Sequence, residues 1–197
     1  MNKQFREVTK DDLIPLEEYS RKRKTIRKEI VNYKKNRRVS LGPHANFYFE
    51  SFKTMKAQIQ EMLYIEKGGD EQLKDELAAY NPLVPKGNEL VATLMFEIDN
   101  PVLRLDFLNK IGGIEKKTYI QVGTDKIIAV PEKDLDRTSS EGKASSVQFL
   151  HFNFSEQLIK NFKDIKNEII IGIDHKIYNY MVKISEDTRN ALIEDFT

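Results

Sequence analysis

Three side chains that could bind a metal ion lie near one another in the sequence. His44 and Glu50 flank an aromatic segment, and Glu61 follows on a segment with helical spacing. Imidazole and carboxylate groups are ligands that Fe, Mn and Zn accept in proteins, and His175 would add a fourth group if the fold brings it close. We therefore treat His44, Glu50, Glu61 and His175 as a candidate metal site, with no catalytic residue assigned.

A structural interpretation of these residues stays open beside the metal hypothesis. The sequence contains neither the Glu-x-x-His pair of di-iron bundles nor a His-Glu-x-x-His motif, so the spacing is not diagnostic. In the alternative, Glu61 pairs with an arginine such as Arg37 or Arg38, and His44 caps the turn after Pro43. Whether the protein is an enzyme is left open by these residues.

A second polar cluster follows the apolar segment 168–174. Asp174 stands beside His175, where a carboxylate can fix the tautomer of an imidazole, and Tyr178 follows closely. Together with Gln58, Asp174 and Tyr178 form a candidate ligand pocket. The alternative is an ordinary turn, in which the Asp174 side chain accepts a hydrogen bond from the backbone two residues on.

Positive charge is concentrated in one stretch of a chain whose formal net charge is only +1. Between residues 21 and 38 stand ten Lys and Arg residues against one acidic residue, Glu29, which gives this stretch a local charge of +9. Such a stretch can bind an acidic protein surface or phosphate groups, although a solvated helix is the commoner interpretation and nucleic acid is the least favoured partner. The candidate residues for anion or partner binding are Arg21, Lys24, Lys28, Arg37 and Arg38.

The composition excludes several kinds of chemistry. With no cysteine among its 197 residues, the chain has no disulfide, no thiolate zinc site and no iron–sulfur cluster bound through Cys. Neither a Gly-x-Ser-x-Gly elbow nor a phosphate-binding loop is present. No apolar stretch approaches the roughly 20 residues of a membrane span, and the first residues lack the apolar part of a signal peptide, so we expect a cytoplasmic protein without a membrane span.

Hydrophobic periodicity and capping residues predict the elements that must position these side chains. We expect a long basic helix over 15–36 and further helices over 53–66, 70–80, 101–112, 155–165 and after Ser185. We expect strands from Val39 and near 46–50, 90–98, 116–122, 126–130, 146–154, 168–174 and 177–184.

Strands that occur both in pairs and between helices indicate an α+β fold, with a mixed, largely antiparallel sheet, flanking helices and a long basic N-terminal helix. We expect one domain over residues 1–197, in which the basic helical segment 1–38 packs on an α+β body at 39–197. The polar segment 131–144 lacks periodicity and is a candidate lid.

The order of several motifs resembles an uncharacterised bacterial family, a domain of unknown function, from about residue 20 to the C-terminus. These motifs are RRVxLGPH (37–44), QEMLxIE (60–66), AYNPLxP (79–85), SSVQFL (145–150) and the pair Asp174-His175. His151 departs from the pattern, in which Arg is expected, so we do not expect it to be an essential ligand. The resemblance implies partners rather than an activity, because members of the family are often neighbours in gene order of rubrerythrin-like proteins and iron–sulfur oxidoreductases.

These observations lead to three functional hypotheses from different classes. The first is a cytoplasmic binding or accessory protein that acts with redox or oxidative-stress partners, to which its basic helix docks. The alternative is a metal-binding protein or a metal-dependent enzyme that uses the His and Glu residues. Binding of nucleic acid or phosphate by the basic helix is third.

Overall fold

The computed structural model of the chain describes residues 7–132 and 143–196. The described residues form six helices: α1 (Leu16–Lys34), α2 (Phe52–Glu66), α3 (Gly69–Tyr80), α4 (Pro101–Lys110), α5 (Glu156–Lys163) and α6 (Glu186–Ile193). Their strands are β1 (Arg38–Leu41), β2 (Ala45–Phe49), β3 (Glu89–Phe96), β4 (Thr118–Val122), β5 (Asp125–Ile128), β6 (Val130–Pro131), β7 (Val147–Asn153), β8 (Ile169–His175) and β9 (Tyr178–Lys183).

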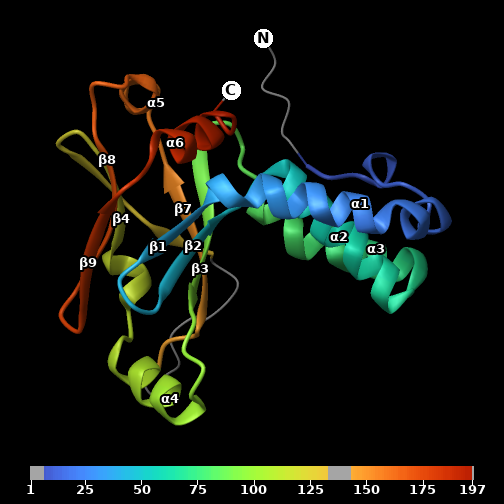
Figure 1. Cartoon of the computed structure of the whole chain (residues 1–197), viewed down its shortest axis with the longest axis horizontal. Helices are drawn as coiled ribbons and strands as arrows, with labels where there is room; N and C mark the ends of the chain where they lie inside the picture. Colours follow the sequence, from blue (N-terminus) through green and yellow to red (C-terminus); the bar gives the residue numbers. More distant parts are fainter. Residues whose placement is uncertain (1–6, 133–142, 197) are drawn as a thin grey trace.

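The strands divide into two antiparallel sheets that face each other (Figure 1). One sheet has five strands in the order β1-β2-β3-β7-β6, and the other has four in the order β5-β4-β8-β9. The main hydrophobic core lies between them and draws side chains from both, among them Phe47, Leu94, Ile120 and Ile171. The predicted α+β class is confirmed, and the strands expected in one sheet form two.

Strand β3 is buried on both faces because different parts of the molecule cover them. Leu90, Ala92, Leu94 and Phe96 alternate toward the main core, as the period of two predicts. Val91 points the other way, into a smaller core that includes residues of α2. The side of the five-stranded sheet that faces away from the other sheet is therefore partly covered by helices.

Helices α1, α2 and α3 form an arm that projects from the sheets (Figure 1). Met55, Ile59 and Leu63 lie along one side of α2 at helical spacing and pack with Leu73 and Leu77 of α3. Ser51 caps α2 by accepting a hydrogen bond from the Thr54 amide. The predicted helices 53–66 and 70–80 are thus confirmed, and they form a helical layer with its own core.

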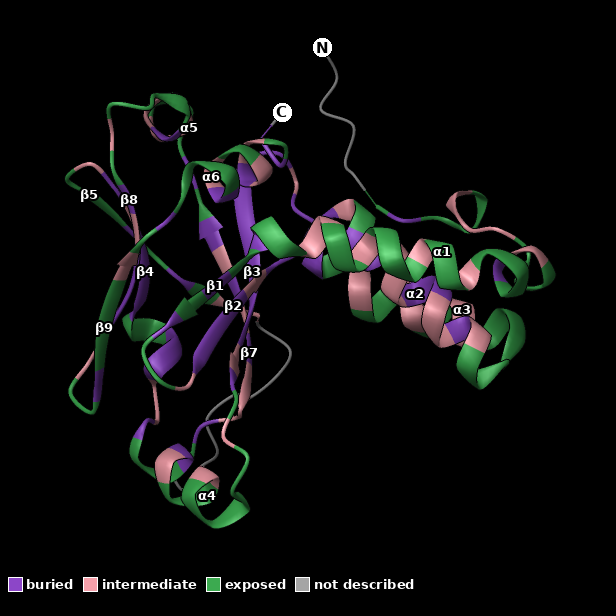
Figure 2. Ribbon diagram, viewed as in Figure 1, coloured by how far each residue is buried: buried purple, intermediate pink, exposed green. Residues whose placement is uncertain are grey.

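The predicted basic helix is present as α1, which continues through a short 3-10 turn, η2 (Lys35–Arg37), directly into β1. We expected its apolar stripe to pack on the α+β body. The stripe packs on α2, which lies within the segment 39–197 given as that body but in its helical arm rather than in its sheets, and Tyr19 is the buried residue of α1. Figure 2 shows α1 as a largely exposed or half-buried helix.

Two further expectations concern the hairpin across residues 123–125 and the candidate lid at 131–144. The predicted hairpin across residues 123–125 is confirmed by the pairing of β4 with β5. The candidate lid at 131–144 falls mostly on residues 133–142, which lie outside the described residues. Along the parts that are described, none of the helices is both long and apolar enough to span a membrane.

Candidate functional site

Each of the four predicted metal ligands has its own local partners. The ring of His44 packs edge-on against Phe107, with centroids 5.3 Å apart, and stacks on Tyr178. Glu50 is buried and accepts hydrogen bonds from the hydroxyls of Thr54 (2.7 Å) and Thr93 (2.8 Å). His44 and Glu50 therefore lie at opposite ends of β2 in unrelated environments.

Glu61 is the acceptor of a compact ion-pair network between α1 and α2. Its carboxylate accepts hydrogen bonds from the Arg23 guanidinium and, at 2.6 Å, from the Tyr19 hydroxyl. The hydrogen bond from Arg23 is the main reason that the pKa of Glu61 is lowered. The ion pair proposed in the structural alternative exists, but its cation is Arg23 rather than Arg37 or Arg38.

The candidate metal site of His44, Glu50, Glu61 and His175 is therefore not assembled. In the two described ranges, no group of three or more His, Asp or Glu side chains could hold a metal ion. The reason is local pairing. The Glu50 carboxylate accepts hydrogen bonds from hydroxyl groups, the Glu61 carboxylate accepts them from an arginine, and the Nδ1 of His175 accepts one from the Ile177 amide.

The residues of the predicted ligand pocket hold turns and helices. The Tyr178 hydroxyl donates to the Leu41 carbonyl (2.6 Å) and accepts from the amides of His44 and Ala45, so it fastens the turn between β1 and β2. Asp174 is an exposed residue of strand β8, opposite Asn179 of β9. The side chain that accepts a hydrogen bond from the backbone two residues on is that of His175, from the Ile177 amide, so the turn alternative is wrong in its detail. Gln58 lies on α2 and contacts the Tyr80 hydroxyl of α3, far from that turn.

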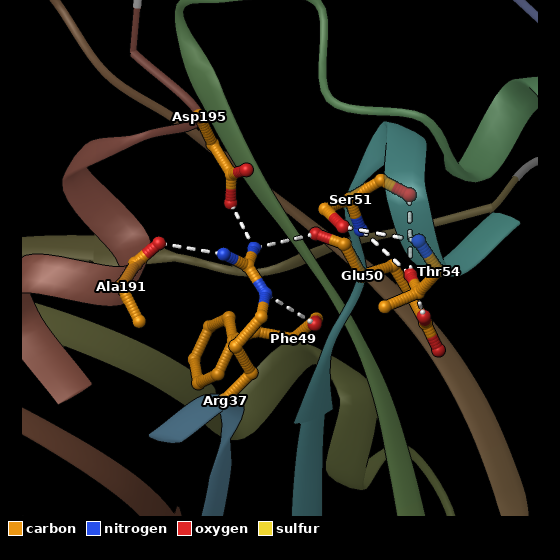
Figure 3. Close-up of polar contacts among 7 residues, drawn as sticks. All are labelled: Arg37, Phe49, Glu50, Ser51, Thr54, Ala191 and Asp195. Atoms are coloured by element: carbon orange, nitrogen blue, oxygen red, sulfur yellow. Dashed lines mark hydrogen bonds and ion pairs between the residues drawn. The ribbon is translucent and has the colours of Figure 1, made fainter. Parts of the chain in front are cut away.

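Arg37, a predicted anion-binding residue, is instead a buried structural residue with 1% of its surface exposed. Its guanidinium donates to the carbonyls of Phe49, Glu50 and Ala191 and to the carboxylate of Asp195 (Figure 3). All its nitrogens are in use. Arg37 therefore cannot receive a partner at the surface, which corrects that prediction.

Arg38 and Arg21 are exposed, but neither lines the groove of Lys24 and Lys28 that is described below. Arg38 lies on β1, pairs with Glu97 (3.4 Å) and lies over the ring of Tyr48. Arg21 lies on α1, outside the set of residues that line the groove described next.

Lys24 and Lys28 do lie together, on one side of α1. They line a groove of about 540 Å³ with Arg23, Arg27, Ser20, Val31 and Tyr64, and we call these seven residues the basic face. Tyr64 comes from α2, and its ring lies 4.9 Å from the guanidinium carbon of Arg23. The basic face thus combines four cations with a hydroxyl-bearing aromatic ring along the seam between two helices.

The cations of the basic face differ in whether they are neutralised. Arg23 pairs with Glu61. Lys24, Arg27 and Lys28 make no ion pair with any carboxylate of the described residues. Neighbouring like charges on a helix repel one another, so an anion placed here relieves that repulsion as well as forming new contacts.

Sequence reasoning found only part of the basic face. Lys24 and Lys28 were predicted, whereas Ser20, Arg23, Arg27 and Tyr64 were missed. The α1 members of the face recur at spacings of three and four, which is the signature of one side of a helix and would have identified Arg23 and Arg27. No sequence signal places Tyr64 beside them.

A second ionisable cluster, also missed, joins three chain segments. The two ring nitrogens of His151 on β7 lie 3.0 Å from a carboxylate oxygen of Glu89 and 2.9 Å from one of Glu132. Burial lowers the pKa of this imidazole, but the hydrogen bonds and charges of Glu89 and Glu132 together outweigh burial, so the pKa is raised. An imidazolium can donate to both carboxylates at once, whereas neutral imidazole can donate to only one.

The sequence matches the profile of a family described as "Protein of unknown function (DUF3501)" over residues 7–196. The chain belongs to the DUF3501 family. The predicted membership of an uncharacterised family is thus confirmed. A solved structure from Burkholderia pseudomallei K96243, described as a novel protein of unknown function, is 34% identical to this DUF3501 chain; the match covers 98% of this chain and 100% of that one, with a TM-score of 0.90. No curated protein has significant sequence similarity to this DUF3501 chain.

In this DUF3501 chain, residues of the motifs that carry the resemblance make hydrogen bonds and ion pairs that hold the fold together. The Asn81 side chain bonds both the amide and the carbonyl of Val8, and Gln60 bonds both backbone groups of Ile14. Arg37 and Glu61 form the networks described above. These contacts fasten the segment before α1 and α1 itself to the rest of the fold.

Proposed function

We propose that the protein is a cytoplasmic binding protein whose basic face docks an acidic surface on a protein partner. One observation supports the proposal: Lys24, Arg27 and Lys28 line one groove and form no ion pair with a carboxylate of the described residues, although the charge of Arg27 also acts on Glu61. Opposite charge on a partner would speed its encounter with this face and orient it.

An acidic protein fits the arm better than an extended polyanion does. The α1 part of the basic face runs from Ser20 to Val31, which is about 17 Å along a helix. The same arm carries exposed acidic side chains on α3, among them Glu71 and Asp75, which would repel a long phosphate backbone. A compact cluster of carboxylates avoids these side chains.

Redox proteins are the partners to test first. The resemblance of the motifs implies rubrerythrin-like proteins and iron–sulfur oxidoreductases as neighbours in gene order. Because the chain has no cysteine, electrons in such an assembly would be carried by the partner's own metal centres. The protein would then act as an accessory subunit that binds and positions the redox partner.

The test compares two triple charge reversals in the full chain. In the first, Lys24, Arg27 and Lys28 are replaced by Glu; in the control, the exposed Lys160, Lys163 and Lys166 near α5 are replaced by Glu, which changes the net charge equally. Binding to a purified rubrerythrin-like protein and to a purified iron–sulfur oxidoreductase is measured by calorimetry at low and high salt.

The expected result is binding that weakens with salt, falls at least tenfold in the first variant and is unchanged in the control. A loss of equal size in both variants, or salt-independent binding, would contradict docking through the basic face. A DNA duplex serves as a second probe: tighter binding of DNA than of either protein would favour the nucleic-acid hypothesis instead.

A further inference from the structure

A second groove runs between α1 and α2 and shares no residue with the basic face. Its volume is about 370 Å³, and its walls include Ile26 and Ile30 of α1 and Phe52 and Ala57 of α2. These four side chains are half-buried, and the groove between them leaves part of their surface accessible. We call this surface the apolar groove.

At one end of the apolar groove, the polar side chains of Gln60 and Tyr19 are hydrogen-bonded to other parts of the protein. Gln60 uses its side-chain amide on both backbone groups of Ile14, at 2.9 and 3.2 Å. The hydroxyl of Tyr19 donates to Glu61. This end therefore offers a ligand apolar contact and no free hydrogen-bonding group, which suits a hydrocarbon tail.

The other end carries positive charge. Lys53 and Lys56 border the groove from α2, and the Lys53 ammonium lies 4.7 Å from the ring centroid of Tyr33 near the end of α1. Glu29 is the acidic residue that borders the groove from α1. Among the residues that line the groove, two ammonium groups face one carboxylate, and the charge of Asp12, which does not line it, also acts on Lys56. Lys53 is therefore the main cation offered to a ligand at this end.

The geometry points to an acyl carboxylate as the ligand of this groove. We propose that a fatty acid of medium chain length binds with its carboxylate at Lys53 and Lys56 and its tail running past Ile30 and Ile26 toward the Gln60 end. The α2 side of the groove extends from Phe52 to Gln60, about 12 Å along the helix, which covers most of one extended acyl chain of this length. This ligand is independent of the partner proposed for the basic face.

The probes are dodecanoate, octanoate and dodecyltrimethylammonium, each titrated into the full chain by calorimetry below its aggregation concentration. Dodecanoate is expected to bind once per chain, and octanoate at least tenfold more weakly because it buries fewer methylene groups. The cationic probe, which has the same tail and the opposite charge, is expected not to bind.

Variants locate the site. Ala57→Phe fills the groove and is expected to abolish binding, and Ile30→Ala, a milder change, is expected to weaken binding. Replacing Lys53 and Lys56 by Glu is expected to lower dodecanoate affinity at least tenfold, whereas the matched replacement of Lys160 and Lys163 leaves it unchanged. Circular dichroism melts show which variants are folded, and Ile30→Ala tests the tail contact if Ala57→Phe does not fold.

Several results would overturn the proposal. They are equal binding of the cationic probe, unchanged binding in the folded groove variants, or binding to phosphatidylglycerol vesicles without binding of free dodecanoate. The triple reversal of Lys24, Arg27 and Lys28 serves to separate the two sites, because it is expected to weaken partner docking and leave dodecanoate binding intact.

Discussion

The guanidinium of Arg37 and the carboxylate of Asp195 form a buried ion pair that joins the start of β1 to the C-terminal end of the described chain. The same guanidinium donates to the carbonyls of Phe49 and Glu50 at the end of β2 (Figure 3). Three segments far apart in the sequence therefore meet at one side chain. This residue lies in the most basic stretch of the chain, yet its role is in the interior.

Replacing Arg37 by Met is expected to destabilise the protein by about 3–5 kcal/mol, because it leaves a buried carboxylate and buried carbonyls without this donor. Urea unfolding at neutral pH measures the change. The control is Arg38→Met at the next position, where the exposed pair with Glu97 is expected to contribute about 0–1 kcal/mol. Equal losses in the two variants would contradict the role assigned to Arg37.

Gly42→Ala is expected to be more destabilising than Gly69→Ala, although both glycines have positive φ, +65° and +72°. A Cβ at Gly42 would lie 2.7 Å from the Tyr178 hydroxyl oxygen, whereas a Cβ at Gly69 meets nothing within 4 Å. Gly69→Ala should therefore show backbone strain alone, about 1 kcal/mol, and Gly42→Ala a further loss of about 1–3 kcal/mol from the clash. Thermal melts of the two variants supply the comparison, and similar values would argue against a tight contact at Tyr178.

Glu61→Gln is expected to lower the free energy of unfolding by about 1–2 kcal/mol, since the hydrogen bonds from Arg23 and Tyr19 lose their charged acceptor. Its folded pKa is lowered, so this stabilisation is present above its ordinary pKa of 4.5 and is lost as the pH falls through the folded value. The difference between wild type and variant should shrink in acid. Glu71→Gln, an exposed change on α3, is the control and should be nearly silent.

The bridge between His151 and the two glutamates should make stability depend on pH near neutrality. The pKa of His151 is raised above its ordinary 6.5, so the charged bridge stabilises the fold fully below about pH 6.5 and is lost as the pH rises through the folded value. NMR titration of the His151 ring gives that folded value directly. In His151→Gln the decline of unfolding free energy over this range should disappear; an unshifted titration would count against the bridge.

The individual helices and strands could be predicted because hydrophobic period, caps and turn residues are local properties. Asn100 and Ser185, for example, cap α4 and α6 as their types suggest. The division into two sheets could not, because it depends on which strands pair across long stretches of chain. Nothing local indicates that β6 leaves the sheet of β5 to pair with β7.

The candidate site was predictable to the extent that helical spacing reveals it. Lys24 and Lys28 lie on the basic face as expected, but Arg37, which has the same charge and lies in the same stretch, is buried by contacts with residues up to the C-terminal end. The charge of a residue alone does not indicate whether its side chain is exposed on the basic face or buried in the interior. Likewise, Glu61 was expected to pair with an arginine, but which one depends on how α1 lies against α2.

The direct passage of α1 through η2 into β1 has a mechanical consequence. With no loop between helix and strand, and with Arg37 bonded at this junction to β2 and α6, the arm cannot tilt on the sheets without stretching buried hydrogen bonds. The arm is therefore rigidly connected to the sheets and does not move about a hinge at this junction. A partner bound along α1 is held at a fixed angle to the two sheets. A force on α1 is transmitted through Arg37 to the C-terminal helix α6.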